Sequence, residues 1–367
     1  MPHAAITGWA KCMPPAVLTN EDLSTFLDTD DEWITTRTGI KERRISHVHI
    51  STLVHVAASR ALAAAGKTGD EVELIIFGST TPDQICPSTA SYIQKMLGAK
   101  KAACMDLNSA CTSFMYSLTA ATSMIQTGVV KNAVVIGAEV ISPVMDWDNR
   151  NVAVLFGDGA SAFYVEATDK EEGLLAEELG CFGEVREILT VHGYGLKYAN
   201  QGIPLGQTEW QFEGQKIFKN AVTGMVGASK KVLKKCGLTT NDLDLVVPHQ
   251  ANLRIIEAVA KRIAIPMDKV FVNVHRYGNM SAATAPVALV EAVEEGRIDP
   301  GSMILVPAFG AGLTWCAHII KWGDRVEPFG ETDVELPPCD KTGLELVEEI
   351  RAKKALWAEA PGGREKA

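Results

Sequence analysis

The sequence lacks several features that assign a chain quickly to a class of protein. Its eight cysteines form no Cys-x-x-Cys pair and no Cys/His spacing typical of a metal site. No stretch approaches the ~18 consecutive apolar residues of a membrane span. The N-terminal segment lacks the basic region and long apolar core of a secretory signal. We therefore expect a reduced, cytoplasmic protein without disulfides, bound metal or membrane attachment.

Positive charge is also scarce in this chain. It has 35 Lys and Arg against 45 Asp and Glu, which gives a formal net charge of −10. Affinity for nucleic acid depends on clusters of Lys and Arg, so the composition argues against nucleic acid as a partner. The chain has 367 residues, 47% of them hydrophobic, which is enough for a large core and a deep internal tunnel.

Charge is absent altogether from residues 108–129, which surround one cysteine. Residues 105–107 predict the end of a strand, residues 112–127 predict a helix, and the junction between them consists of small residues around Cys111. A thiol at a helix N-terminus faces the positive end of the helix dipole and free backbone N–H groups, which lower its pKa and can stabilise an oxyanion. Cys111 is a candidate nucleophile, and a buried structural cysteine is the alternative.

Short apolar runs alternate with helical patterns along the chain. Unalternated runs of this kind are typical of strands that are buried on both faces, and strands that alternate with helices indicate an α/β fold. The predicted strands cover residues 74–78, 133–137, 245–248 and 303–306, and the predicted helices cover residues 53–65, 112–127 and 282–295.

The pattern also repeats at an offset of about 170 residues. Leu74 matches Leu245 in similar strand sequences, and Gly128 matches Gly296 at similar helix ends. A constant shift across several elements indicates two similar halves. In this alignment Cys111 falls opposite residues 279–281.

Two further polar residues follow predicted strands in the second half. His249 comes after a buried run and Pro248, although a lone histidine at such a place is more often structural. Asn279 follows Gly278 before a helix, where an N-cap is the ordinary interpretation. If the duplication brings the strand ends together, a cysteine nucleophile would meet two hydrogen-bond donors, a set suited to thioester chemistry through an enolate.

A glycine-rich turn at residues 309–315 (FGAGLTW) follows the last long strand. Its backbone can approach a thiol closely and donate a second N–H group to an oxyanion. A simple turn is the alternative interpretation of this segment.

Six segments together resemble the β-ketoacyl-acyl carrier protein synthase III family of thiolase-fold condensing enzymes. The resemblance covers about residues 3–322 and implies a five-layered αβαβα fold of two duplicated halves, 1–172 and 173–322, usually in a homodimer. The remaining residues, 323–367, form an extension in which residues 341–358 predict an amphipathic helix. The matching segments are 28–44, 109–114, 155–161, 247–256, 276–283 and 309–315.

The resemblance implies a Cys-His-Asn triad at Cys111, His249 and Asn279, and an oxyanion hole formed by the N–H groups of Cys111 and Ala311. It implies acyl-CoA and malonyl-acyl carrier protein as substrates, with no cofactor and no metal. The other implied positions are Trp33, Arg37 and Arg150 for the adenine end of CoA; Phe212, Gly214, Ala251 and Asn252 for the pantetheine tunnel; Cys86 and Phe309 for the acyl pocket; and Arg254 for carrier-protein docking.

Three positions depart from the family pattern. Asn151 replaces a glycine beside the adenine site, Ser161 ends the usual GDGAG segment, and Ala311 interrupts a run of three glycines. The last change is tolerable because only a backbone N–H is required there. In the family, the turn corresponding to residues 85–88 reaches across the dimer interface and forms the far wall of the partner's acyl pocket. At the position of Cys86, members restricted to acetyl groups tend to carry a large aromatic residue. The smaller thiol therefore predicts room for medium or longer acyl groups, unless neighbouring side chains fill the space.

The resemblance predicts a decarboxylating Claisen condensation that starts fatty acid chains. The motifs leave open a same-fold enzyme of a polyketide, quinolone or long-chain ketone pathway with another acceptor. A degenerate partner subunit is disfavoured by the intact triad. A thiolase is disfavoured because no second cysteine lies near Asn279, and a hydroxymethylglutaryl-CoA synthase because no suitable glutamate precedes Cys111.

Overall fold

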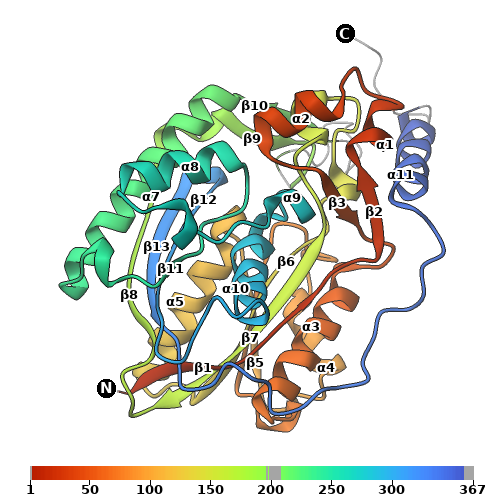
Figure 1. Cartoon of the computed structure of the whole chain (residues 1–367). Coiled ribbons are helices and arrows are strands. Elements are labelled where there is room, and N and C mark those ends of the chain that lie inside the picture. Colours follow the sequence, from red (N-terminus) through yellow and green to blue (C-terminus); the bar gives the residue numbers. More distant parts are fainter. Residues whose placement is uncertain (1, 196, 198–207, 359–367) are drawn as a thin grey trace.

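One large mixed sheet forms the centre of the molecule (Figure 1). The computed structural model describes residues 2–195, 197 and 208–358. Within these residues the strand order is β11-β12-β13-β8-β1-β7-β6-β4-β5. The strands are β1 (His3–Cys12), β4 (Leu74–Gly78), β5 (Ala103–Leu107), β6 (Asn132–Glu139), β7 (Gly159–Thr168), β8 (Gly173–Cys181), β11 (Leu245–Val246), β12 (Met303–Gly310) and β13 (Thr314–Lys321).

The strand order repeats on the two sides of the sheet. On one side β4 pairs with β6 in parallel, and β6-β7-β1 continue antiparallel. On the other side β11 pairs with β12 in parallel, and β12-β13-β8 continue antiparallel. The two sets join where β1 and β8 pair in parallel at Ala4 and Gly173. The duplication predicted from the sequence is therefore confirmed, whereas the limits at residues 172 and 322 stay predictions.

Successive residues of a strand point to opposite faces of the sheet, and each face packs against its own hydrophobic core. Apolar residues are therefore needed on both faces, which explains the unalternated apolar runs. In β6, Val135 belongs to a central core that it shares with helices α5 (Ser113–Gln126) and α10 (Thr284–Glu294). Its neighbour Val134 belongs to an outer core with α3 (Ile50–Ala65) and α4 (Thr89–Met96).

The second half of the sheet follows the same rule. In β12, Ile304 belongs to the central core, and Leu305 packs in the core covered by α7 (Gly214–Cys236) and α8 (Leu253–Arg262). The two halves of the sheet therefore form two β layers with α5 and α10 between them, and further helices cover the outer face of each half. This gives the predicted five αβαβα layers (Figure 1).

The three helices predicted from the sequence are all present, with ends shifted by up to three residues. The third predicted strand of the sequence is shorter than expected, because β11 ends at Val246. Pro248 follows and has no N–H to donate to a ladder. The backbone nevertheless stays beside β12, since His249 N donates to the Pro307 carbonyl at 2.9 Å.

Smaller elements cover one end of the sheet. Helices α1 (Asn20–Ser24) and α2 (Asp31–Thr38) lie beside a hairpin of β2 (Ala16–Thr19) and β3 (Glu42–Ile45) (Figure 1). A second pair, β9 (Leu189–His192) and β10 (Glu209–Phe212), leads into α7. Among the residues that the structure describes, no helix is both long and apolar enough to cross a membrane.

The C-terminal extension first crosses the outer face of α3. Arg60 on that helix pairs with Glu335 at 2.6 Å, and His47 contacts the Pro337 carbonyl at 2.8 Å. The extension then forms α11 (Gly343–Ala358), which packs against β2 and β3. Residues 359–367 of the predicted extension lie outside the described part.

The predicted helix is confirmed, but its predicted apolar face needs one correction. Val347 is fully buried, and Leu344 and Ile350 pack against the core. Leu356 is 67% exposed, because it lies about two and a half turns beyond Val347 and so on the opposite side of the helix. Leu346, which is buried, takes its place against the core.

Candidate active site

Two corresponding turns of the duplicated fold meet at the candidate nucleophile. In the first half, the turn Ala110–Thr112 carries Cys111 and leads into α5. In the second half, the turn Ser281–Ala283 leads into α10. Ala110 and Ser281 both have positive φ angles, 54° and 48°, which residues other than glycine rarely adopt. The two halves therefore bend their chains in the same way before their central helices.

The sulfur of Cys111 is surrounded by hydrogen-bond donors. The Ser281 hydroxyl donates to Sγ at 3.4 Å. The backbone N–H groups of Cys111 and Ala311 also act on the sulfur. Cys111, His249 and Asn279 all line one cavity of about 720 Å³, so the convergence predicted from the duplication is found.

The acidity of the thiol differs from the expectation. Burial raises the pKa of Cys111 to about 11, and the charge of Glu139 raises it too, while the Ser281 hydroxyl and the backbone N–H groups of Cys111 and Ala311 lower it. The expectation of a lowered pKa is therefore wrong, because the cost of placing a thiolate away from water exceeds the effect of the donors.

His249 is held in a neutral state at the bottom of the cavity. Its side chain is almost fully buried, and burial lowers its pKa to about 3. Nδ1 shares a hydrogen bond with the Thr284 hydroxyl, whose single proton can go either to Nδ1 or to the Ser281 carbonyl, 3.0 Å away. A neutral imidazole carries a single N–H. When Thr284 donates to Nδ1, Nε2 carries the proton and can donate it into a hydrogen bond with a substrate.

Asn279 is fixed by its backbone and by its side-chain oxygen. Its N–H donates to the Leu155 carbonyl at 2.8 Å, and Oδ1 accepts from the N–H of Ser281 at 2.8 Å. The preceding Gly278 has a φ of 62°, which glycine adopts without penalty. Because Oδ1 is occupied, the NH₂ group of Asn279 is the donor available to the cavity.

The glycine-rich turn packs directly on the nucleophile. A Cβ atom at Gly310 would lie 2.8 Å from the backbone nitrogen of Cys111, so only glycine fits there. The hydroxyl of Thr314 donates to the Ser109 carbonyl at 2.9 Å and fastens the two turns to each other. This close approach brings the N–H of Ala311 to the sulfur, and the alanine side chain does not prevent it.

The predicted CoA residues gather at the mouth of the same cavity. The guanidinium carbons of Arg37 and Arg150 lie 4.5 and 4.7 Å from the centre of the Trp33 ring. Arg150 begins the short helix α6 (Arg150–Ala153) and is outside the lining itself. Of the residues predicted for CoA and pantetheine, Trp33, Arg37, Phe212, Gly214, Ala251 and Asn252 line the cavity. Phe309, predicted for the acyl pocket, and Arg254, predicted for docking, line it too.

Comparison with known proteins places this geometry in a family. Two sequence models match the chain: 3-oxoacyl-[acyl-carrier-protein (ACP)] synthase III at residues 105–183, and the C-terminal part of the same synthase at residues 233–322. The β-ketoacyl-[acyl-carrier-protein] synthase III 2 of Vibrio cholerae is 50% identical over 345 residues, which are 94% of this chain and 95% of that protein. The chain belongs to the β-ketoacyl-acyl carrier protein synthase III family.

Solved structures agree with this assignment. The crystal structure of 3-oxoacyl-[acyl-carrier-protein] synthase III from Aquifex aeolicus superposes with a TM-score of 0.81 at 42% identity, over 87% of this chain and all of that one. The priming β-ketosynthase of the R1128 polyketide pathway gives 0.82 at 31% identity, over 89% and 97%. The predicted family, thiolase-like fold and acyl-transferring enzyme class are thereby confirmed.

One predicted residue of the synthase lies away from the cavity. Cys86 is exposed in the loop between β4 and α4, beside Ile85, which is 72% exposed. It is not among the residues that line the cavity of its own chain. The predicted role of Cys86 concerns the acyl pocket of a second subunit and stays a prediction.

Sequence reasoning missed three residues of the synthase site. Ser281 and Thr284 could have been found, because the repeat aligns them with the turn and helix start at Cys111. Glu139 ends β6 in a fully buried position, where Oε1 accepts from the Ser79 hydroxyl at 2.7 Å and Oε2 has no hydrogen-bond partner among the described residues. Nothing in its local sequence distinguishes this carboxylate from an ordinary acidic residue at a strand end.

Proposed function

We propose that this synthase condenses the acyl group of an acyl-CoA with malonyl-acyl carrier protein, releases CO₂ and gives 3-oxoacyl-acyl carrier protein, the first condensation of fatty acid synthesis. The observation that carries the proposal is the meeting of a half-buried thiol with two buried donors, His249 and Asn279, in one cavity with an aromatic and basic mouth. The same cavity can admit first a CoA thioester and then a carrier-protein thioester.

In the first half-reaction, Cys111 attacks the thioester carbonyl of acyl-CoA. The carbonyl oxygen gains negative charge and accepts hydrogen bonds from the N–H groups of Cys111 and Ala311. The C–S bond to CoA breaks, the acyl group remains on Cys111, and the proton lost by the thiol ends on the departing CoA sulfur. Because the pKa of the free thiol is raised to about 11, deprotonation accompanies substrate binding and does not precede it.

In the second half-reaction, malonyl-acyl carrier protein enters the same tunnel. Its carboxylate leaves as CO₂, and the electron pair of the broken C–C bond forms an enolate. The enolate oxygen accepts hydrogen bonds from Nε2–H of His249 and from the NH₂ group of Asn279. The enolate carbon attacks the acyl-cysteine carbonyl, and Cys111 leaves as a thiolate that recovers a proton.

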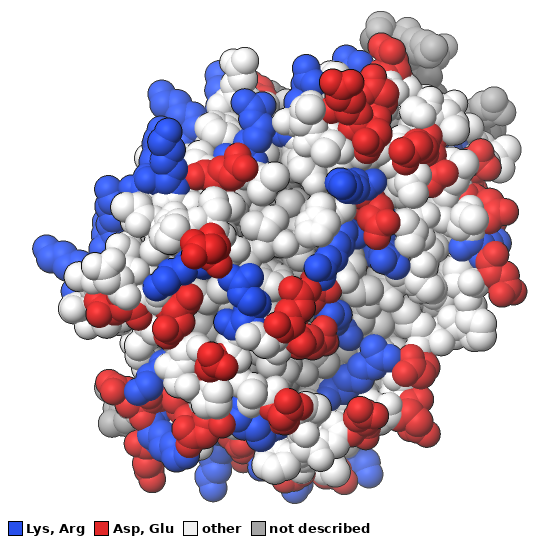
Figure 2. Space-filling model, in the orientation of Figure 1, with Lys and Arg blue, Asp and Glu red and all other residues white. Residues whose placement is uncertain are grey.

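The mouth of the cavity serves both substrates in this scheme. Trp33, Arg37 and Arg150 hold the adenine end of CoA, and Phe212, Gly214, Ala251 and Asn252 line the pantetheine path. Lys and Arg side chains are numerous over α7 and α8, whereas Asp and Glu gather near α1 and α2 (Figure 2). Exposed Arg254 at the mouth docks the acidic carrier protein by charge complementarity.

The proposal includes a homodimer in the cytoplasm that needs no cofactor and binds neither nucleic acid nor membrane. The second candidate is a priming synthase of a polyketide pathway, which the 31% identity to the R1128 enzyme favours. The higher identity to the Vibrio cholerae synthase favours the fatty acid reaction.

Mass spectrometry of the intact protein tests the first half-reaction. We expect each accepted acyl-CoA to add its acyl mass to wild type and not to Cys111→Ala. A panel of chain lengths also tests whether donors longer than acetyl-CoA are preferred, as predicted from Cys86. Malonyl-acyl carrier protein should then convert the acyl-enzyme into free enzyme and 3-oxoacyl-carrier protein. Absence of an adduct with every donor would refute the reaction, and turnover with only another acceptor would favour the second candidate.

A further inference from the structure

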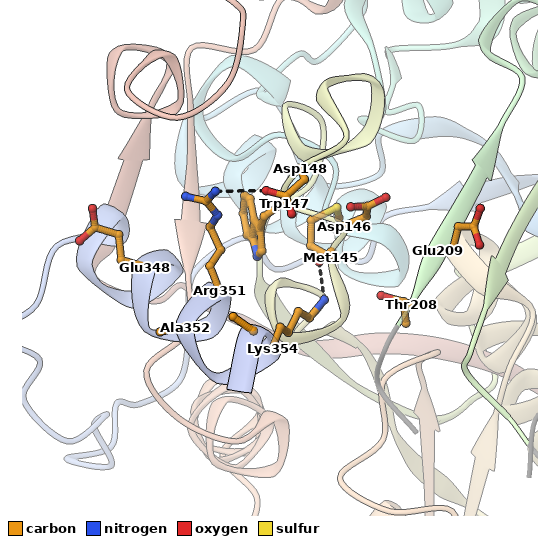
Figure 3. Close-up of a pocket in the computed structure, with 11 residues that line it drawn as sticks. Met145, Asp146, Trp147, Asp148, Thr208, Glu209, Glu348, Arg351, Ala352 and Lys354 are labelled. Atoms are coloured by element: carbon orange, nitrogen blue, oxygen red, sulfur yellow. Dashed lines mark hydrogen bonds and ion pairs between the residues drawn. The ribbon is translucent and has the colours of Figure 1, made fainter. Parts of the chain in front are cut away.

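Helix α11 of the C-terminal extension contacts two segments that lead to the CoA mouth (Figures 1 and 3). The guanidinium of Arg351 donates to Asp148 Oδ1 at 3.1 Å, and its carbon lies 4.6 Å from the centre of the Phe26 ring. Phe26 also packs edge-on against Trp147, with ring centres 6.5 Å apart. One side chain of the extension therefore touches Phe26 in one segment and Asp148 in the other.

The same two segments meet again at the mouth through Arg150. Its guanidinium donates to the backbone carbonyl of Asp28 and pairs with the Asp28 carboxylate at 3.4 Å, while it lies against Trp33. Asp148 is two residues before Arg150, and Phe26 is two residues before Asp28. Arg351 thus links the two segments through Asp148 and Phe26, each of which lies two residues before the Arg150–Asp28 contact.

A second contact from α11 holds the beginning of the loop. Lys354 Nζ donates to the Met145 carbonyl at 2.6 Å, at the edge of a pocket of about 630 Å³ between α11 and residues 145–148 (Figure 3). Next to Met145, the indole N–H of Trp210 donates to the Val144 carbonyl at 3.0 Å. Residues 144–148 are therefore held from the body of the enzyme and from the extension together.

Binding of an adenine ring between Trp33 and Arg150 requires the Arg150 side chain to move away from the indole. Two stacking contacts need about 7 Å between the flanking groups, and the guanidinium of Arg150 now lies 4.7 Å from the ring centre. A loop that is tethered near its moving end loses less conformational freedom when it closes on a ligand.

We propose that α11, through Arg351 and Lys354, positions residues 145–150 so that Arg150 can close on the nucleotide end of acyl-CoA. This inference rests on the proposed use of Trp33 and Arg150 for CoA. The two residues of α11 are positioning residues, since they contact the loop and not the reacting atoms.

The distribution of the extension fits such an accessory role. The whole of the Aquifex aeolicus synthase aligns with 87% of this chain. The fold is therefore complete without the other residues of this chain. The Vibrio cholerae synthase aligns over 94% of this chain, a span that cannot fit within residues 1–322 and so includes part of the extension.

A comparison of two acyl substrates that carry the same acyl group distinguishes a positioning role of α11 from general damage to the enzyme. One is the acyl-CoA, and the other is the acyl-pantetheine, which lacks the nucleotide. We expect Arg351→Gln and Asp148→Asn each to raise KM for acyl-CoA about three- to fivefold, as for the loss of one exposed ion pair with an aromatic contact. The kinetics with acyl-pantetheine, kcat and Tm should stay unchanged, as should all values for the control Lys353→Gln, an exposed residue on the same helix.

The variant Trp33→Ala distinguishes failure of this inference from failure of the proposed CoA site. If Trp33→Ala weakens acyl-CoA selectively and Arg351→Gln does not, the positioning role of α11 is refuted and the CoA site stands. If neither variant discriminates between the two donors, both ideas are refuted. Equal weakening of both donors by Arg351→Gln would indicate a general structural role and would also overturn the inference.

Discussion

Ser281 donates a hydrogen bond to the sulfur of Cys111 at 3.4 Å, and the two residues lie in corresponding turns of the two duplicated halves. The nucleophile belongs to the first half, and its donor belongs to the second. Both turns keep the same unusual backbone, with positive φ at Ala110 and Ser281. Duplication has therefore placed a thiol in one copy of the turn and a hydrogen-bond donor to that thiol in the other.

Replacement of Ser281 by alanine should slow acylation of Cys111. The change removes the hydroxyl that favours the thiolate, so the pKa of the thiol rises further. Loss of one such hydrogen bond predicts a decrease of about fivefold in the rate of acyl-enzyme formation, which time-resolved mass spectrometry can measure. Malonyl decarboxylation in the absence of a primer serves as the control, because the N–H of residue 281 that holds Asn279 remains. An unchanged acylation rate would show that the contact has no catalytic effect.

Thr284 should act on the second half-reaction through His249. The tautomer that serves the reaction needs the Thr284 hydroxyl to donate to Nδ1; Thr284→Val keeps the volume but removes this hydroxyl, so the Nε2–H tautomer loses its support. We expect malonyl decarboxylation to slow about tenfold or more while acylation by acyl-CoA is retained. Thr284→Ser is the matched control, since it restores the hydroxyl and should restore most of the rate. Equal activity of the valine and serine variants would contradict the assignment.

We expect opposite effects on activity from substitutions at Gly310 and Ala311, which are neighbours in the glycine-rich turn. An alanine at 310 would place Cβ 2.8 Å from the Cys111 nitrogen and push the two turns apart. We expect Gly310→Ala to lower kcat by about 100-fold or more, as for loss of an oxyanion donor. Ala311→Gly keeps the N–H and should leave steady-state activity close to wild type. High activity of Gly310→Ala would mean that the turn is not held as closely as the structure has it.

The raised pKa of Cys111 predicts a characteristic alkylation profile. The thiolate is the reactive form, and its fraction grows about tenfold for each pH unit below the pKa. With a pKa of about 11, the rate of iodoacetamide labelling at Cys111 should rise at about this slope from pH 7 to 10 without a plateau. Peptide mapping by mass spectrometry measures the rate, and bound acyl-CoA should abolish it. A plateau near neutral pH would show instead that the thiol is strongly acidified.

Much of the site followed from the sequence because its signals are local. Unalternated apolar runs mark strands buried on both faces, and their recurrence at an offset of about 170 residues marked two similar halves. The small residues around Cys111, the Pro248-His249 strand end and the glycine-rich turn at 309–315 each carry their chemistry within a few positions. A few neighbouring residues of the sequence are therefore enough to predict such turns.

Only the tertiary structure decided how these parts act on one another. The pKa of Cys111 depends on how much water the whole fold removes from the sulfur, so the local helix-terminus argument gave the wrong direction. The contacts of Ser281 with Cys111 and of Thr284 with His249 join residues more than thirty positions apart. The approach of Arg351 to Asp148 spans more than two hundred. Desolvation and long-range contacts depend on how the whole molecule packs, so no short stretch of sequence determines them.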